Sequence, residues 1–166
     1  MMGKIVFDDE PGNVPEATYA GINYVDKVSC KEVIRYNEGA GKKKVVLVDC
    51  GVKTNIIRCL LKRDVEVIRV PWNHDFTGME YDGLFISNGP GDPDTCDEAV
   101  QHIRKAMSLS DKPIFGICMG NQLLSKAGGA TIYKLKYGHR SHNQAGAHDR
   151  NGTLFHYQSE PRLCGR

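Results

Sequence analysis

The sequence lacks the features that define several large classes of protein. No apolar run approaches the roughly 20 residues that cross a bilayer, and residues 1–10 hold no apolar signal-peptide segment. The net charge of +2 is too small to indicate a nucleic-acid or membrane-surface partner. Neither G-x-G-x-x-G nor G-x-x-x-x-G-K-[ST] occurs, which argues against a flavodoxin-like nucleotide binder. Together with the composition, these absences favour a soluble globular protein.

Cysteine pairs of the kind that hold metals are also absent. The chain has six cysteines, but none are spaced as C-x-x-C. Neither a zinc site nor a disulfide framework is indicated, so we expect no metal. The thiols are expected to be reduced, and the protein to be cytoplasmic.

The pattern of apolar residues predicts an α/β fold. The 166 residues, 40% of them hydrophobic and 25% charged, suffice for one globular domain with a real core. Residues 45–48 form a continuous apolar run, which is typical of a strand buried on both faces. Further strands are predicted at 65–71, 83–87, 114–117 and 131–133, and helices at 54–63, 95–107 and 122–127. This alternation predicts a doubly wound, mostly parallel sheet.

Some local features follow from capping and turn residues. Asp94 or Thr95 is expected to cap the helix that follows, and Gly128-Gly129 to end the last helix. The segment 24–33 fits a helix or a strand, and the pattern does not decide between them. The glycine-rich stretch 37–41 reads as a linker.

The clearest chemical signal is the cysteine in Gly116-Ile117-Cys118-Met119-Gly120. G-x-C-x-G after a predicted strand and before a predicted helix is the thiol counterpart of the nucleophile elbow G-x-S-x-G. The turn must be sharp, so a side chain at either glycine would collide with a neighbouring element. A thiol at a helix N-terminus is favoured as the thiolate. The alternative is a buried cysteine that acts as a small hydrophobic residue.

A second glycine-rich stretch, Asn88–Pro93, follows the strand predicted at 83–87. In open parallel sheets the site lies at the carboxyl ends of the strands, so this loop and Cys118 are expected to face each other. By itself, Gly89-Pro90-Gly91 also fits an ordinary turn.

These motifs together resemble a known family. S-N-G-P-G-D-P at 87–93 and G-I-C-M-G-N-Q at 116–122 are similar to class I glutamine amidotransferase domains. Four further stretches resemble the small subunits of carbamoyl phosphate synthetases: V-D-C-G-V-K-T-N at 48–55, V-P-W-N-H-D-F at 70–76, Y-D-G-L-F-I-S at 81–87 and G-H-R-S-H-N-Q at 138–144. The motifs run from about residue 20 to Gln144. The resemblance divides the chain into a remnant of a preceding domain (1–41), a partial amidotransferase domain (42–144) and an aberrant tail (145–166).

The resemblance implies a reaction and roles for several residues. Family members hydrolyse glutamine to glutamate and ammonia, and the ammonia passes to a large subunit that uses ATP and Mg²⁺ to make carbamoyl phosphate from bicarbonate. No cofactor is implied on this chain. Cys118 would form the γ-glutamyl thioester, the N–H groups of Gly91 and Met119 would stabilise the oxyanion, and Gln122 with Gly89 would bind substrate. Lys53 matches a family position near the site.

One expected part is missing. The family supplies the base as a histidine within H-x-E, and no H-x-E occurs in the sequence. The tail can be encoded by a set of codons whose next reading frame continues the family pattern. From Ala145 onward, that shifted frame reads P-V-R-M-I-G-T-E-R-C-F-T-I-S-Q-N-H-G-F-A. We therefore hypothesise a one-base insertion near codon 145, an irregular tail, and an incomplete C-terminal part of the fold. A divergent natural C-terminus is the alternative, and nucleotide sequence with incompatible codons would exclude the insertion.

Three other functions compete with an active glutaminase subunit. The missing H-x-E favours a non-catalytic subunit with the same fold. The chain also fits the glutaminase component of another amidotransferase, such as an anthranilate or GMP synthase, although P-W-N-H-D-F and G-H-R-S-H-N-Q argue against it. A nucleotide binder would need a phosphate loop, which the sequence lacks.

Overall fold

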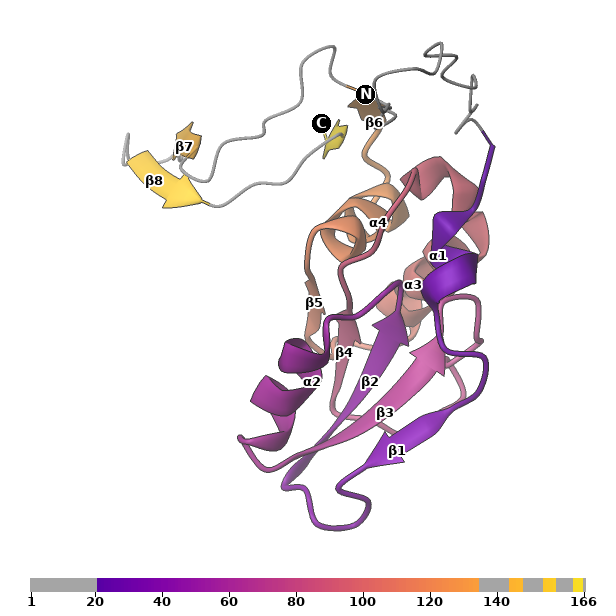
Figure 1. Cartoon of the computed structure of the whole chain (residues 1–166), viewed down its shortest axis with the longest axis vertical. Helices are drawn as coiled ribbons and strands as arrows, with labels where there is room; N and C mark the ends of the chain where they lie inside the picture. Colours follow the sequence, from indigo (N-terminus) through magenta and orange to yellow (C-terminus); the bar gives the residue numbers. More distant parts are fainter. Residues whose placement is uncertain (1–20, 135–143, 148–153, 158–162, 166) are drawn as a thin grey trace, which may run out of the picture.

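The computed structural model describes residues 21–134, 144–147, 154–157 and 163–165. The described part begins with a short helix and contains one five-stranded sheet (Figure 1). In chain order the elements are α1 (Tyr24–Val28), β1 (Ile34–Tyr36), β2 (Lys43–Asp49), α2 (Thr54–Leu61), β3 (Val65–Pro71), β4 (Gly83–Ile86), the 3-10 helix η1 (Pro93–Thr95), α3 (Asp97–Leu109), β5 (Ile114–Gly116), α4 (Met119–Ala127), β6 (Ile132–Lys134), β7 (Gln144–Ala147), β8 (Leu154–Tyr157) and β9 (Leu163–Gly165).

The main sheet has the strand order β1-β3-β2-β4-β5. The pairs β2–β3, β2–β4 and β4–β5 are parallel, and only the edge strand β1 is antiparallel, to β3. The predicted doubly wound, mostly parallel sheet is therefore confirmed. The central strand β2 carries the continuous apolar run, as expected for a strand with neighbours on both sides and helices on both faces.

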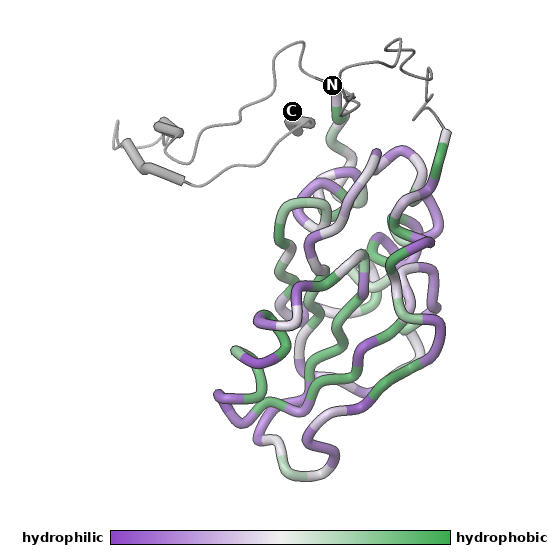
Figure 2. Tube along the Cα trace, in the orientation of Figure 1, coloured by the Kyte–Doolittle hydropathy of each residue, from purple (hydrophilic) through white to green (hydrophobic). Residues whose placement is uncertain are grey.

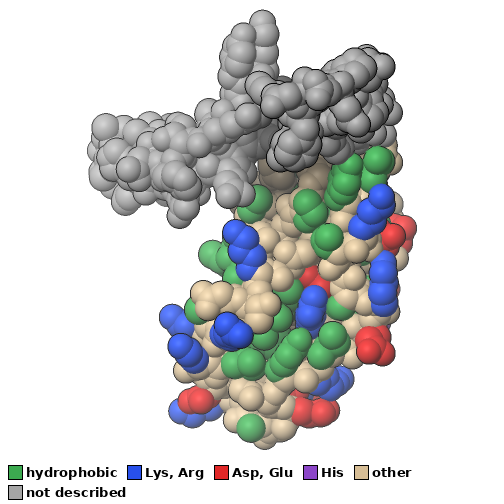
Figure 3. All heavy atoms as spheres, viewed as in Figure 1, with side chains coloured by type: hydrophobic (Ala, Val, Ile, Leu, Met, Phe, Trp, Pro, Cys, Tyr) green, Lys and Arg blue, Asp and Glu red, His purple; other side chains and the backbone are tan. Residues whose placement is uncertain are grey.

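Helices cover the two faces of this sheet unequally. On one face, Val46 and Val48 of β2 pack into a large core with Val25 of α1 and with residues of α3 and α4. On the other face, Leu47 packs with Val67 and with Ile57 of α2 in a smaller cluster. Figure 2 shows the hydrophobic strands in the middle of the described domain. In Figure 3 apolar side chains gather on the lower half of the visible face, with lysines and arginines around them.

The strand β5 forms the other edge of the main sheet and exposes an aromatic side chain. Phe115 is 59% exposed and lies 5.5 Å, between ring centroids, from Phe85 of the neighbouring strand β4. Both rings lie on the face that α2 covers only in part, because Phe85 packs against the α2 cluster.

The segment 24–33, for which the sequence pattern left helix and strand open, is helical at its start and non-helical in its second half. Asn23 caps the single-turn helix α1 by accepting a hydrogen bond from the Asp26 N–H, 3.0 Å away. The chain then leaves the helix and pairs with β3 only from Ile34. A segment that changes structure halfway shows no single period, which is why its pattern was ambiguous.

The predicted cap of α3 is wrong. Pro93–Thr95 forms a 3-10 turn of its own, capped by the Asp92 side chain, and α3 begins after Cys96 without a side-chain cap. The predicted end of α4 is confirmed: Gly128 is its C-cap, and Gly129 has a positive φ of 94°.

The two ends of the chain leave the proposed domain boundaries untested. Residues 1–20 of the expected N-terminal remnant lie outside the described residues, as do positions 138–143 of the G-H-R-S-H-N-Q motif. In the described part of the tail, β7 pairs with β8, and β9 pairs with β6. No helix of the described ranges is both long enough and apolar enough to span a bilayer.

Candidate active site

Cys118 lies where the carboxyl ends of β4 and β5 meet. It caps α4 immediately after β5. Two backbone hydrogen bonds fix the turn to β4: the Ile117 N–H donates to the Ile86 carbonyl and the Gly120 N–H donates to the Ser87 carbonyl, each at 3.0 Å. The predicted strand–cysteine–helix junction is present.

The elbow is strained at the cysteine itself. Cys118 has φ 53° and ψ −109°, a backbone region that residues other than glycine rarely adopt. The flanking glycines allow the close approach of neighbouring elements. A Cβ at Gly116 would lie 2.5 Å from the Gly120 carbonyl carbon, and one at Gly120 would lie 2.2 Å from the Ile86 carbonyl oxygen. The predicted steric role of both glycines is confirmed.

Exposure separates Cys118 from most other thiols of the described chain. Cys118 and Cys59 are exposed, whereas Cys50 and Cys96 are buried and Cys30 is partly buried. Burial raises the pKa of Cys30 and of Cys96 to about 11 and that of Cys50 well above its ordinary value. These three thiols stay protonated near neutral pH. Because Cys118 is exposed, its alternative interpretation as a buried hydrophobic residue is excluded.

The loop Asn88–Pro93 lies beside the elbow because it leaves the neighbouring strand β4. Gly91 has φ +92°, and a Cβ there would lie 3.2 Å from the Tyr24 Cβ of α1. Gly89 is required by packing, since a Cβ there would lie 2.1 Å from the Cys50 carbonyl oxygen. The loop is therefore wedged between α1 and the end of β2, and an ordinary surface turn would not need these glycines.

The residues predicted to stabilise an oxyanion are placed on both sides of this junction. Met119 is the first residue of α4, with its side chain buried and its N–H at the helix N-terminus. Gly91 belongs to the facing loop. Within the described ranges, no hydrogen-bond acceptor is found for either N–H. Their role as oxyanion donors stays a prediction.

Gln122 and Lys53 also lie at the carboxyl edge of the sheet. The Gln122 N–H donates to the Cys118 carbonyl at 3.1 Å, so Gln122 follows the cysteine by one turn of α4, on the same face. Lys53 precedes α2, and its N–H donates to the Asn88 side chain at 3.3 Å. The structure thus brings Lys53 to the glycine-rich loop, although its ammonium group is exposed.

Asp49, to which the sequence analysis assigned no role, organises the neighbouring corner. Its buried carboxylate accepts hydrogen bonds from the N–H groups of Gly51, Val52 and Cys30 at 2.7–2.9 Å, and from the Arg69 guanidinium at 2.6 and 2.9 Å. Burial alone would raise the pKa of Asp49, but these donors hold it below its ordinary value. A basic residue within the apolar strand 65–71 was the signal that could have identified this pair.

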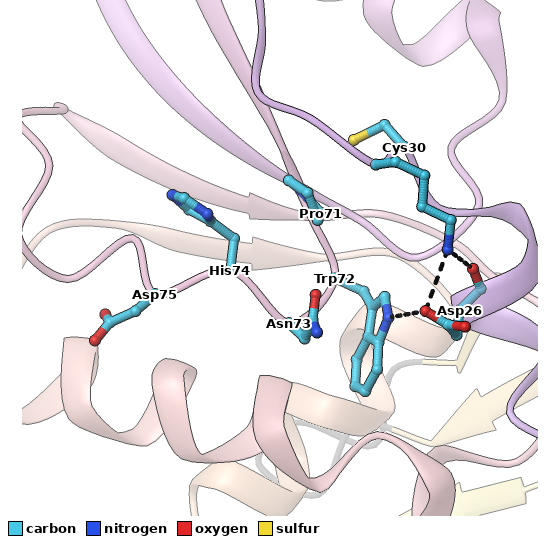
Figure 4. Close-up of a pocket in the computed structure, with 8 residues that line it drawn as sticks. Asp26, Cys30, Pro71, Trp72, Asn73, His74 and Asp75 are labelled. Carbon is cyan, nitrogen blue, oxygen red and sulfur yellow. Dashed lines mark hydrogen bonds and ion pairs between the residues drawn. The ribbon is translucent and has the colours of Figure 1, made fainter.

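A hollow of about 440 Å³ lies apart from the cysteine, after the carboxyl end of β3 (Figure 4). Within its lining, Lys31 and the Trp72 indole both donate to Asp26, at 3.2 Å each. Cys118 does not line this hollow, so we place the candidate site at the elbow.

Comparison with known sequences supports the same region. The sequence profile described as "Glutamine amidotransferase class-I" matches residues 46–163, a range that includes the glycine-rich loop and the elbow and extends past Gln144. The chain is 46% identical over 147 residues to the carbamoyl phosphate synthase small chain of Pyrococcus furiosus. It is 45% identical over 158 residues to the multifunctional protein CAD of Squalus acanthias. It is also 45% identical over 145 residues to the mitochondrial carbamoyl-phosphate synthase [ammonia] of Homo sapiens.

The chain spans only part of these relatives. The matches cover 86% of this chain and 39% of the small chain, 94% and 7% for CAD, and 87% and 10% for the human enzyme. Among solved structures, a putative GMP synthase subunit from Thermoplasma acidophilum superposes with a TM-score of 0.61 at 23% identity, over 74% of this chain and 66% of that one. This likeness supports the fold.

Proposed function

Because the chain belongs to the class-I glutamine amidotransferase family, we propose that it is the glutamine-hydrolysing part of a carbamoyl phosphate synthase. The single observation that carries the proposal is the exposed Cys118 on a strained elbow, beside a glycine-rich loop at the carboxyl edge of the sheet. The similarity to carbamoyl phosphate synthases at 45–46% identity supports this choice of amidotransferase.

The proposed chemistry follows from the positions of these groups. The Cys118 sulfur attacks the side-chain amide carbon of glutamine, and the carbonyl oxygen becomes an oxyanion between the N–H groups of Gly91 and Met119. Collapse of the oxyanion expels the amide nitrogen as ammonia, which takes up the proton that the Cys118 thiol gave up, and leaves a γ-glutamyl thioester. Water then releases glutamate and the free thiol. Gln122 and Gly89 border the space for the glutamine substrate, with Lys53 beyond the loop.

The partner and cofactors are part of the proposal. A relative named as a small chain implies a larger synthetase partner, which would receive the ammonia and carry the ATP and Mg²⁺. The product would serve arginine or pyrimidine biosynthesis.

Turnover needs a base for the thiol and for the water. The 166 residues contain no H-x-E, and loss of a base from a nucleophile–base pair costs up to about 10⁶ in rate. We therefore expect this chain to react at Cys118 but to release ammonia from glutamine very slowly.

The test uses a glutamine analogue in which a chloroketone replaces the amide. We expect it to alkylate Cys118 in preference to every other thiol, and excess glutamine to protect the site. Cys118→Ala should abolish this reaction, whereas Cys59→Ala, which removes the other exposed thiol, should leave it unchanged. Mass spectrometry of the modified peptide gives the result. Labelling without preference for Cys118, or without protection by glutamine, would overturn the proposed function.

A second candidate is a non-catalytic subunit with the same fold. The human relative, at 45% identity, is named carbamoyl-phosphate synthase [ammonia]. A subunit of an enzyme that uses free ammonia needs no glutamine hydrolysis. Ammonia release measured with the purified chain and glutamine tests this candidate: sustained turnover that Cys118→Ala abolishes would contradict both the non-catalytic function and our expectation of very slow release.

A further inference from the structure

Lys126 connects the two segments that form the proposed site. It lies in the last turn of α4, the helix that begins beside Cys118. Its ammonium contacts Asp94 at 2.8 Å and Asp97 at 3.2 Å, and it lies 3.5 Å from the Pro93 carbonyl oxygen. All three acceptors belong to the continuation of the glycine-rich loop into η1 and α3. One side chain of the nucleophile helix therefore holds the far end of the loop that carries Gly91.

The loop is fixed at both ends, with Gly91 between them. At its start, the Ser87 carbonyl accepts the Gly120 N–H of α4, and the Asn88 amide donates to the Gly51 carbonyl. At its end, Lys126 holds Asp94, and the Asn23 amide donates to the Thr95 carbonyl at 2.9 Å. Gly91 itself has φ +92° and lies against Tyr24. Its N–H direction thus depends on both ends of the loop.

The Lys126 ammonium lies in a segment of the surface that is rich in acidic residues. Asp92, Asp94, Asp97 and Glu98 follow one another closely after Gly91. The Lys126 side chain is only 19% exposed, while Asp94 and Asp97 are 69% and 73% exposed. Partial burial alone would lower the pKa of Lys126, but the two aspartates raise it, so the cation persists at neutral pH.

We infer that Lys126 is a positioning residue, which holds the Asp94–Asp97 turn so that the Gly91 N–H points at the oxyanion formed from glutamine at Cys118. This inference rests on the proposed function. It assigns no contact between Lys126 and substrate. A merely structural ion pair with such exposed carboxylates would contribute little to stability and nothing to the site.

The test compares two alkylating reagents on the same thiol of the full chain. The chloroketone analogue needs its carbonyl polarised by the oxyanion donors, whereas iodoacetamide needs only an accessible thiol. In Lys126→Met we expect the maximal rate of chloroketone alkylation to fall on the order of tenfold, because small displacements in a site have large effects on rate. The analogue concentration for half-maximal rate and the iodoacetamide rate should each change by less than about twofold. Lys126→Arg should restore most of the lost rate, since it keeps the charge.

A matched control removes the same charge elsewhere. Lys105 of α3 pairs with Asp75 at 3.2 Å, and Lys105→Met should leave both reagents' rates unchanged. Asp94→Asn, which weakens the shortest Lys126 contact from the other side, should slow the chloroketone reaction in the same selective way if Lys126→Met does not fold.

The outcomes keep the two proposals apart. Equal chloroketone rates in wild type, Lys126→Met and Asp94→Asn would overturn the positioning role while leaving the glutaminase proposal intact. A parallel fall with both reagents would also overturn it, because it would show a general disturbance of the elbow. If the chloroketone labels the wild type without preference for Cys118, both the proposed function and the role of Lys126 would be overturned.

Discussion

Two neighbouring corners at the carboxyl edge of one sheet are built in opposite ways. In the Asp49 corner, at the ends of β2 and β3, a buried carboxylate is surrounded by three backbone N–H groups and an arginine. In the Cys118 corner, at the ends of β4 and β5, an exposed thiol lies on a strained backbone next to a loop of glycines. The first corner satisfies its polar groups and stabilises the fold. The second keeps a thiol exposed at a cost in backbone strain.

The difference shows how the sheet divides stability from chemistry. Parallel strands bring all their carboxyl ends to one edge, so any of these ends could carry a site. Here the Asp49 carboxylate at the end of β2 is surrounded by hydrogen-bond donors of the chain, whereas the Cys118 thiol after β5 is exposed. The comparison can be tested by substitutions that should affect stability in opposite directions.

The largest effect on stability is expected in the Asp49 corner. Asp49→Asn removes the charge that faces Arg69 and places an amide donor among backbone donors, so we expect a loss of about 3 kcal/mol of unfolding free energy. Urea denaturation of the full chain gives this number. Asp64→Asn is the control: it affects only the exposed pair with Lys42, 4.0 Å apart, and should change stability by less than about 0.5 kcal/mol. Equal small losses in both variants would remove the contrast between the corners.

The pH dependence of the unfolding free energy should also report the contribution of Asp49. The pKa of Asp49 is held below its ordinary value in the folded state, so its contribution is present above about pH 4 and is lost as the pH falls through the folded pKa. Between the two pKa values the slope from this one group can reach about 1.4 kcal/mol per pH unit.

Urea midpoints between pH 6 and pH 2.5 measure this dependence. We expect wild type and Asp49→Asn to differ most at pH 6 and to converge as the pH falls. The exposed aspartates with lowered pKa values, Asp26 and Asp82 among them, are common to both proteins and cancel in the comparison. A difference that stays constant down to pH 2.5 would contradict the assignment.

The smallest effect, with the opposite sign, is expected at the elbow. Glycine adopts the backbone of Cys118 without strain, so Cys118→Gly should raise the free energy of unfolding by about 1 kcal/mol while it abolishes alkylation by the chloroketone. The same substitution at Cys59, inside the helix α2, should lower it by about 0.3 kcal/mol, because glycine is a poorer helix former than cysteine. If both substitutions destabilise equally, the elbow is not a strained corner.

The sequence predicted those parts of the fold whose pattern is carried by neighbouring residues. The apolar run before Asp49 identified β2, and the two glycines around Cys118 identified the elbow, because both signals are local. Interactions between distant residues were missed. Two examples are the Asp49–Arg69 pair and the contacts of Lys126 with Asp94 and Asp97. These contacts depend on which strands and helices become neighbours, and no local pattern indicates this.

The error at the start of α3 has a different and local cause. Asp94 and Thr95 have the residue types of helix caps, but Pro93 at the first position of a 3-10 turn and the Asp92 side chain start that turn earlier. The Lys126 contacts then hold the turn. The local cap at Asp92 thus starts a separate turn, and the contact with α4 holds it in place.

The position of Trp72 gives the chain a built-in optical probe of one corner. It is the only tryptophan of the 166 residues, it is 7% exposed, and its indole N–H donates to Asp26 while its backbone N–H donates to Ser29. Intrinsic fluorescence excited at the indole band therefore reports on the end of β3, beside the Asp49 corner, and carries no tryptophan signal from the elbow. Recorded together with thiol reactivity at Cys118, the emission distinguishes a local opening of the elbow from the unfolding of the whole sheet.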